Sequence, residues 1–247
     1  MTQASAPSPQ SCLVIGLAGT IASGKSTVGQ LLVERGAVHC DGDKLVHRLY
    51  DPGTPGFDRV VAAFGEDVVS PDGTIDRKKL GEKVFGKPEE MNKLTTAMGS
   101  ITQAFKDQIG EWRRDLPADG VAVIEAVNLM EPGYARWCDQ VWLIGVDDRI
   151  AKQRMVATRG MSEEEAAQRL KSMVPFERRA PGADWIYKND GTMEDLEEAV
   201  DEEFRRVYAL HQEGKLPHSR FEAWWQELMR ENRERMRAAG VELADEV

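Results

Sequence analysis

A short segment near the amino terminus has the residue types and spacing that bind a polyphosphate. Residues 19–26 read Gly-Thr-Ile-Ala-Ser-Gly-Lys-Ser and match the pattern G-x-x-x-x-G-K-[ST]. Glycines let backbone N–H groups close around phosphate oxygens, and the helix that follows adds the positive end of its dipole. In such a loop Lys25 bridges the β- and γ-phosphates, and the hydroxyl of Ser26 ligates Mg²⁺.

This segment lies between a predicted strand and a predicted helix, which is the context that a phosphate-binding loop requires. The alternative is a glycine-rich turn that binds nothing, and the agreement of strand, loop and helix argues against it. The sequence therefore predicts a nucleotide site. The residues expected to contact the nucleotide are Gly19, Thr20, Ile21, Ala22, Ser23, Gly24, Lys25, Ser26 and Thr27.

Carboxylates follow two of the predicted strands. Asp41 and Asp43 come after the second strand, and Glu125 follows the third. The carboxyl ends of strands in a doubly wound sheet face the ligand crevice, where a carboxylate can accept the proton of an attacking hydroxyl. We expect one of the two aspartates to cap the helix that begins near Lys44 and the other to act in this way. Glu125 is placed to hold Mg²⁺ through water, and a buried acid paired with a basic residue would look the same.

Two arginines later in the chain are candidates for stabilising charge on a phosphoryl group in transfer. Arg154 and Arg159 lie on and after the helix that follows the fourth predicted strand. An arginine in this role can contribute about 10³–10⁵ in rate. For Arg154 a solvated helix face is the alternative. The phosphate-binding loop alone does not define a reaction, because several classes of nucleotide-using protein share it. The sequence has no Asn-Lys-x-Asp motif for reading guanine, which argues against a GTPase.

Four apolar segments, each next to glycine or acidic residues, predict a parallel sheet covered by helices on both faces. They begin at Cys12, Ala37, Val121 and Val141. A helix is predicted over Lys25–Arg35, and two more over Asp148–Thr158 and Ser162–Met173, the second with a capping box at its start. Together these elements predict a three-layer α/β fold of the P-loop NTPase kind.

The domain organisation follows from changes along the chain. Residues 12–210 are predicted to form one α/β domain, in which 51–115 is a helical insertion broken by Pro-Gly and Asp-Gly turns and 150–175 is a helix pair. Residues 1–11 read as a disordered tail. Residues 211–247 form a helical extension whose apolar stripe, from Phe221 through Trp224, Trp225, Leu228 and Met229 to Met236, is expected to pack on the protein's own core. A partner surface is the minority interpretation.

Composition narrows the classes of partner. The chain has 247 residues, with 32 Lys+Arg against 42 Asp+Glu and a formal net charge of −10. This acidic balance argues against nucleic acid and membrane surfaces as partners. Three scattered cysteines indicate reduced thiols, and no segment approaches the ~20 apolar residues of a membrane helix. We expect a cytoplasmic protein that is a monomer or a weak homo-oligomer and acts on a small molecule.

With these residues established, the chain resembles the dephospho-CoA kinases from about Leu13 to Tyr208. The resemblance implies transfer of the γ-phosphate of ATP, with Mg²⁺, to the ribose 3′-hydroxyl of dephospho-CoA. It implies that residues 12–210 form the P-loop kinase domain, with 51–115 as its CoA-side domain and 150–175 as its lid region. The matching segments are Gly-Leu-Ala-Gly-Thr-Ile-Ala-Ser-Gly-Lys-Ser-Thr (16–27), Asp-Gly-Asp (41–43), Pro-Gly-Thr-Pro-Gly (52–56), Phe-Gly-Glu-Asp-Val (64–68), Asp-Gly-Thr-Ile-Asp-Arg-Lys-Lys-Leu (72–80) and Val-Phe-Gly-Lys-Pro-Glu-Glu-Met-Asn-Lys-Leu (84–94).

The resemblance also implies roles for single residues. Asp43 matches the presumed catalytic base, Arg154 an arginine at the start of the lid, and Asn189 an asparagine beside the adenine of ATP. The predicted catalytic residues are therefore Lys25, Asp43 and Arg154. The predicted metal-site residues are Ser26 and Glu125.

Several positions depart from the family pattern, most of them on the acceptor and lid side. Family members usually have His-Pro at Gly99-Ser100, Pro-Leu-Leu at Val127-Asn128-Leu129, Gln near Met173 and Asp at Lys188. Two alternatives therefore stay open. One is a divergent kinase that acts on another small-molecule hydroxyl, and the other is a non-catalytic nucleotide-binding protein whose Trp-rich C-terminal helix recruits a partner.

Overall fold

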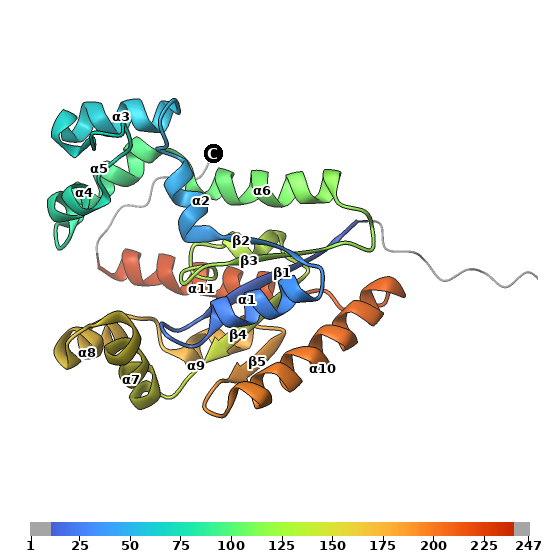
Figure 1. Ribbon diagram of the computed structural model, residues 1–247. Helices are drawn as coiled ribbons and strands as arrows, with labels where there is room; N and C mark the ends of the chain where they lie inside the picture. The colour runs from blue at the N-terminus through green and yellow to red at the C-terminus, as the bar shows by residue number, and fades with distance from the viewer. Residues whose placement is uncertain (1–10, 240–247) are drawn as a thin grey trace, which may run out of the picture. The chain divides into compact units, whose positions relative to one another are not determined.

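A five-stranded sheet organises the chain over residues 11–239, the part that this computed structural model describes (Figure 1). The strand order is β2-β3-β1-β4-β5. β1 lies parallel to β3, with Leu13 opposite Val121, and parallel to β4, with Ile15 opposite Gln140. The strands are β1 (Leu13–Gly19), β2 (Val38–Asp41), β3 (Val121–Glu125), β4 (Gln140–Gly145) and β5 (Trp185–Lys188).

The sequence predicts β1, β2, β3 and β4, each beginning within one residue of its observed start. It does not predict β5. β1, β3 and β4 are buried along their whole length, so their sequences are continuous apolar runs. β5 lies at the edge of the sheet, where Ile186 and Lys188 are exposed. Four residues of alternating burial give no run that stands out from a loop.

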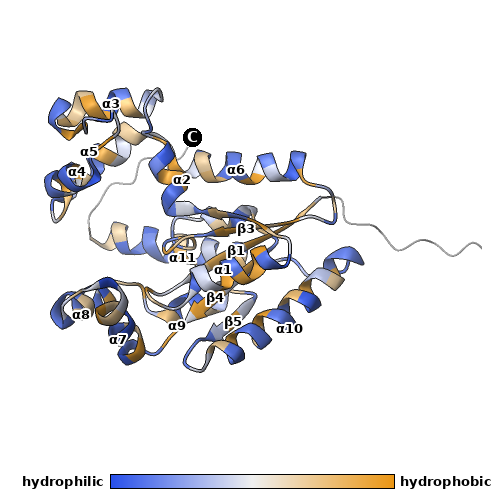
Figure 2. Cartoon of the chain, viewed as in Figure 1, coloured by the Kyte–Doolittle hydropathy of each residue, from blue (hydrophilic) through white to orange (hydrophobic). Residues whose placement is uncertain are grey.

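The apolar core of this sheet lies between alternate strand residues and the helices α1 (Lys25–Glu34) and α10 (Met193–Gln212). The apolar residues that predict helical spacing in α1, Val28, Leu31 and Leu32, are all buried. Figure 2 shows the hydropathy of the residues along this helix. α10 starts at a capping box formed by Thr192 and Asp195. The buried members of this core are Leu13, Ile15, Leu17, Val28, Leu31, Leu32, Ala37, Val121, Val123, Trp142, Ile144, Leu196, Val200 and Val207.

The opposite side of β1 packs against the segment that follows β3. A Cβ placed on Gly16 would lie 2.9 Å from Leu129 Cδ2 and 3.0 Å from Cys138 Sγ, so a larger residue at this strand position would require these side chains to shift. Cys12, Cys40 and Cys138 are all buried and free, as the cysteine spacing predicts. Burial raises the pKa of Cys138, which keeps its thiol protonated.

Residues 40–110 form a second compact unit, separate from the first unit of residues 1–39 and 111–247. Its helices surround their own apolar cluster, which includes Val60, Phe64 and Leu80. The Pro55-Gly56 pair, expected from the sequence to break a helix, instead starts one: Pro55 is in the first turn of α3, where its missing N–H is not needed. The helices are α2 (Gly42–Arg48), α3 (Pro55–Phe64), α4 (Arg77–Val84), α5 (Pro88–Met98) and the beginning of α6 (Ile101–Asp115).

The remaining helices belong to the first unit. They are α7 (Asp148–Arg159), α8 (Glu163–Lys171), α9 (Phe176–Arg179) and α11 (Phe221–Ala238). Ser162 and Glu165 form the predicted capping box of α8. The predicted stripe of α11 is buried at Phe221 and half-buried at both tryptophans, while Met236 is exposed, contrary to expectation. Residues 1–10 of the predicted tail and 240–247 of the predicted extension lie outside the described residues.

Among residues 11–239, no helix combines the length and the apolarity that crossing a bilayer would need.

Candidate active site

The predicted phosphate-binding loop joins β1 to α1 and has a backbone that its glycines make possible. A Cβ on Gly19, whose φ is +158°, would lie 2.2 Å from the carbonyl oxygen of Ile144. Gly24 precedes α1 with a φ of +92°, and a Cβ there would lie 2.5 Å from Asn189 Nδ2. Ala22 has a φ of +58° and is the one non-glycine residue with a positive φ in the described chain. These conformations keep the loop backbone close to its neighbours.

Lys25 lies against the loop that it would serve. Its side chain is 9% exposed, and Nζ donates to the carbonyl oxygens of Thr20 at 2.9 Å and Gly19 at 3.4 Å. These contacts place the ammonium group at the loop. A positive charge is therefore held where phosphate oxygens bind to this type of loop.

Ser26 and Glu125 come from different elements and meet at the start of α1. The Ser26 hydroxyl donates to Glu125 Oε1 at 3.0 Å, and His39 Nε2 lies 3.8 Å from the same oxygen. Glu125 is buried, and its Oε2 has no hydrogen-bond partner among the described residues. No cluster of three metal-ligating side chains occurs within residues 11–239. An oxygen-only set of this kind suits Mg²⁺, which uses few protein ligands and completes its shell with water and substrate phosphates.

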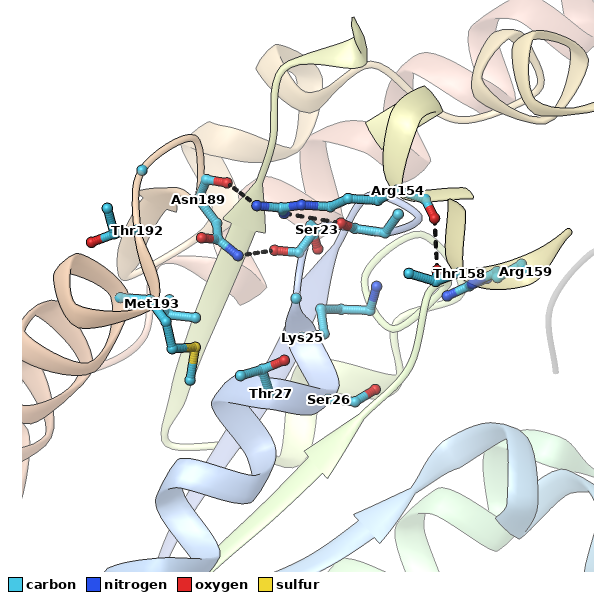
Figure 3. Close-up of a pocket in the computed structure, with 14 residues that line it drawn as sticks. Ser23, Lys25, Ser26, Thr27, Arg154, Thr158, Arg159, Asn189, Thr192 and Met193 are labelled. Atoms are coloured by element: carbon cyan, nitrogen blue, oxygen red, sulfur yellow. Dashed lines mark hydrogen bonds between the residues drawn. The ribbon is translucent and has the colours of Figure 1, made fainter. Parts of the chain in front are cut away.

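Arg154 and Asn189 close the loop from the side of β5 and α7. Arg154 Nη1 donates to the Ala22 carbonyl at 3.3 Å, and Nη2 donates to the Asn189 carbonyl at 3.1 Å. Asn189 Nδ2 donates to the Ser23 carbonyl at 2.9 Å. Figure 3 shows the Arg154 side chain lying across the loop toward Asn189. Arg154 is thus a loop contact and is not on a solvated helix face.

A pocket of about 390 Å³ opens between these groups. The sequence predicts nine loop residues at the nucleotide, of which Gly19, Thr20 and Ile21 are absent from the lining of this pocket. Arg159, the second candidate lid arginine, is at its rim with Thr158, and α10 contributes positions that the sequence analysis did not identify. The lining residues are Ala22, Ser23, Gly24, Lys25, Ser26, Thr27, Arg154, Thr158, Arg159, Asn189, Gly191, Thr192, Met193 and Leu196.

Two residues that contact the beginning of the loop carried no assigned function in the sequence analysis. The Ile21 N–H donates to Met173 Sδ at 3.3 Å, so a departure from the family pattern lies directly on the loop. Arg179 is 1% exposed and donates from Nη1 to the Gly19 carbonyl at 3.3 Å. No spacing or motif marks either residue. Lys188, another departure, lies with Nζ 5.5 Å from the centre of the Phe176 ring.

Asp41, the last residue of β2, and Asp43, in the first turn of α2, differ in what they contact within the second unit. Asp41 Oδ1 accepts from the backbone N–H groups of Asp43 and Lys44 at 3.0 and 3.2 Å, so Asp41 is the helix cap. Asp43 lies in the first turn and makes no capping bond. The structure confirms that one of the two aspartates caps the helix and assigns this role to Asp41. The catalytic role of Asp43 stays a prediction. In the same unit, Gly99 ends α5 with a φ of +100°, and Ser100 Oγ accepts from Gln103 N–H.

A strand, a glycine-rich loop and a helix carrying Lys25 and Ser26, with an arginine from α7 across the loop, define a P-loop nucleotide-binding protein. The family model for dephospho-CoA kinase matches residues 13–195, and the chain belongs to that family.

Individual relatives agree with this assignment. The dephospho-CoA kinase of Symbiobacterium thermophilum is 39% identical over 194 residues, which cover 78% of this chain and 80% of that protein. The dephospho-CoA kinase of Geobacter sulfurreducens is 40% identical over 192 residues, which cover 76% and 95%. A crystal structure of TT1252 from Thermus thermophilus superposes with a TM-score of 0.66 at 27% identity, covering 80% of this chain and 98% of that one. The predicted fold class and kinase family are therefore confirmed.

Proposed function

We propose that this protein transfers the γ-phosphoryl group of ATP to the ribose 3′-hydroxyl of dephospho-CoA and so forms coenzyme A. The observation that carries the proposal is a phosphate loop with Lys25, Ser26 and Glu125 brought together in a chain of the dephospho-CoA kinase family. A protein that only binds nucleotide has no need of a proton-accepting carboxylate such as Asp43. The alternative of a non-catalytic binder is therefore the weaker one.

In this proposal the chain's own groups position reactants and stabilise charge, which is most of the catalysis in phosphoryl transfer. Asp43 orients the acceptor hydroxyl and accepts its proton, while the hydroxyl oxygen forms a bond to the γ-phosphorus. The bond between that phosphorus and the bridging oxygen of ADP breaks. Lys25 and Arg154 supply positive charge to the phosphate oxygens as their charge shifts.

Ser26 and Glu125 are the residues that would hold Mg²⁺, the hydroxyl as a ligand and the carboxylate through water. A bound Mg²⁺ would neutralise charge on the β- and γ-phosphates. The fit rests on the buried, unpartnered Oε2 of Glu125 beside an oxygen ligand. We further propose that the helical unit contributes the CoA side of the site, that residues 150–175 form a lid, and that the enzyme works in the cytoplasm on small molecules alone.

The acceptor is tested by measuring ATP consumption with and without dephospho-CoA in a coupled assay. We expect turnover that depends on dephospho-CoA and a product phosphorylated at the 3′ position. Parallel assays with other pantetheine-containing and nucleoside hydroxyl compounds serve as controls, because the departures at Gly99 and Val127 lie on the acceptor side. Turnover with one of those compounds alone would favour the divergent kinase, and tight ATP binding with no turnover would favour the binder.

Replacing Glu125 with glutamine is expected to raise the Mg²⁺ concentration for half-maximal rate by about 10- to 100-fold, the range typical of groups that act through a metal's outer shell. The amide can still accept from Ser26, so the change removes charge more than it removes packing. The measurement is initial rate against Mg²⁺ at fixed ATP. Glu203→Gln is the matched control, because Glu203 is an equally buried acid that pairs with Arg206 in α10. An unchanged Mg²⁺ dependence would assign Glu125 to a structural pair with His39.

A further inference from the structure

Helix α11 lies beyond the residues that the family model matches and contacts two segments of the first unit. These segments are the 3-10 helices η2 (Tyr134–Trp137) and η3 (Ala180–Gly182). Two adjacent tryptophans of α11 also donate hydrogen bonds to residues that precede these two short helices in the chain. Trp224 Nε1 donates to the carbonyl oxygen of Arg178 at 2.9 Å, and Trp225 Nε1 donates to the carbonyl oxygen of Glu131 at 3.2 Å. The indole N–H groups of α11 are therefore used within the chain.

The two carbonyls belong to the backbone on either side of a buried ion pair. Arg179 Nε donates to Glu131 Oε1, and the Arg179 side chain is 1% exposed. The Arg178 carbonyl is part of the peptide bond that joins Arg178 to Arg179, so the hydrogen bond from Trp224 holds the backbone next to Arg179. The hydrogen bond from Trp225 holds the backbone of Glu131 itself. Each partner of the pair is thus anchored by one indole of the same helix.

The rings fit against glycines that leave no space for a side chain. A Cβ on Gly182 would lie 2.6 Å from the Trp224 ring, and one on Gly133 would lie 2.7 Å from the Trp225 ring. The Arg136 guanidinium lies 3.9 Å from the centre of the Trp225 ring, a cation–π distance. The position of each indole is therefore fixed by close packing as well as by its hydrogen bond.

Arg179 connects this arrangement to the phosphate loop. Its Nη1 donates to the Gly19 carbonyl, the same oxygen to which Lys25 Nζ donates at 3.4 Å. The Gly19 carbonyl at the start of the loop thus accepts hydrogen bonds from two positively charged side chains, Lys25 at the start of α1 and Arg179 in α9. Glu131 offsets the charge of Arg179, which would otherwise repel the ammonium group of Lys25.

We infer that Trp224 and Trp225 are positioning residues for the nucleotide site, acting through the Glu131–Arg179 pair on the carbonyl of Gly19. The inference rests on the proposed function for the identity of the ligand, ATP. It assigns to the C-terminal helix a part in ATP binding, in place of the recruitment of a partner. Its effect falls on ATP and leaves the acceptor's own binding untouched.

The test is the double variant Trp224→Phe/Trp225→Phe, which keeps an aromatic ring at each position and removes both N–H donors. We expect the Kd for ATP, measured by calorimetric titration without acceptor, to rise about three- to tenfold, the range for loss of one or two hydrogen bonds. KM for ATP should rise in parallel, with KM for dephospho-CoA unchanged. Arg230→Gln is the matched control, because its side chain is 57% exposed and pairs only within α11.

The thermal unfolding midpoint of each variant shows whether the two tryptophans position the nucleotide site or only stabilise the fold. A lower midpoint with an unchanged Kd for ATP, measured well below that midpoint, would overturn the inference. Arg179→Lys is the second test: it keeps the charge and cannot donate to Glu131 and Gly19 in the fork geometry of arginine. We expect it to weaken ATP binding at least as much as the double variant, and wild-type ATP affinity would also overturn the inference. Because these titrations need no acceptor, they stand apart from the assay with dephospho-CoA.

Discussion

Asp43→Asn is expected to lower turnover by about 10²–10⁴, the range for loss of a general base, while ATP still binds. The amide keeps the size of the side chain and loses the ability to accept a proton. Helix α2 should remain, because Asp43 contributes only a first-turn charge and the cap is made by Asp41. The measurement is kcat with saturating ATP and dephospho-CoA, together with an ATP titration of the variant.

The neighbouring aspartate gives a matched control. Asparagine caps helices about as well as aspartate, so Asp41→Asn should fold and turn over close to the wild type. The two variants differ by two positions along one helix start and remove the same charge. Unchanged turnover in Asp43→Asn would take that residue out of the mechanism. A loss in Asp41→Asn as large as in Asp43→Asn would show that the helix start, and not one carboxylate, is required.

The parts of the fold that the sequence predicts are those with a strong local pattern. β1, α1 and the capping box at Ser162 each combine an apolar run or helical spacing with a glycine or a capping residue. β5 was missed because its burial depends on its place at the sheet edge, which no local pattern records. The prediction at Pro55 is wrong because the Pro-Gly pair is typical of a turn, whereas Thr54 before it is a capping residue and marks the start of a helix.

The same division holds at the candidate site. Lys25 and Ser26 belong to one contiguous motif, so the sequence predicts both their presence and their closeness to the loop. Met173 and Arg179 reach the loop from more than 150 residues away, Met173 through an N–H···S bond at Ile21 and Arg179 through the Gly19 carbonyl. Their side chains have no type or spacing that signals a loop contact. Long-range packing brings them there, and only the fold reveals it.

Lys25→Met is expected to give the largest loss, with kcat/KM for ATP lowered by about 10³–10⁴. Removing one preorganised donor from a developing anion costs about 10²–10³ in rate, and losing a hydrogen bond to a charged phosphate weakens ground-state binding by about tenfold or more. Methionine replaces most of the buried stem and removes the charge, so the fold should tolerate it.

The control for Lys25→Met is Lys215→Met, which removes one positive charge from a side chain that is 66% exposed and pairs with Glu213 after α10. Lys215→Met should leave kcat/KM for ATP unchanged. Both variants lose one positive charge, but only the ammonium group of Lys25 lies at the phosphate loop. ATP titration and steady-state rates measure both. The Gly19 carbonyl still accepts from Arg179 when Lys25 is replaced, so a loss of activity would reflect the missing charge at the phosphates and not a collapsed loop. Normal activity in Lys25→Met would mean that the triphosphate binds elsewhere.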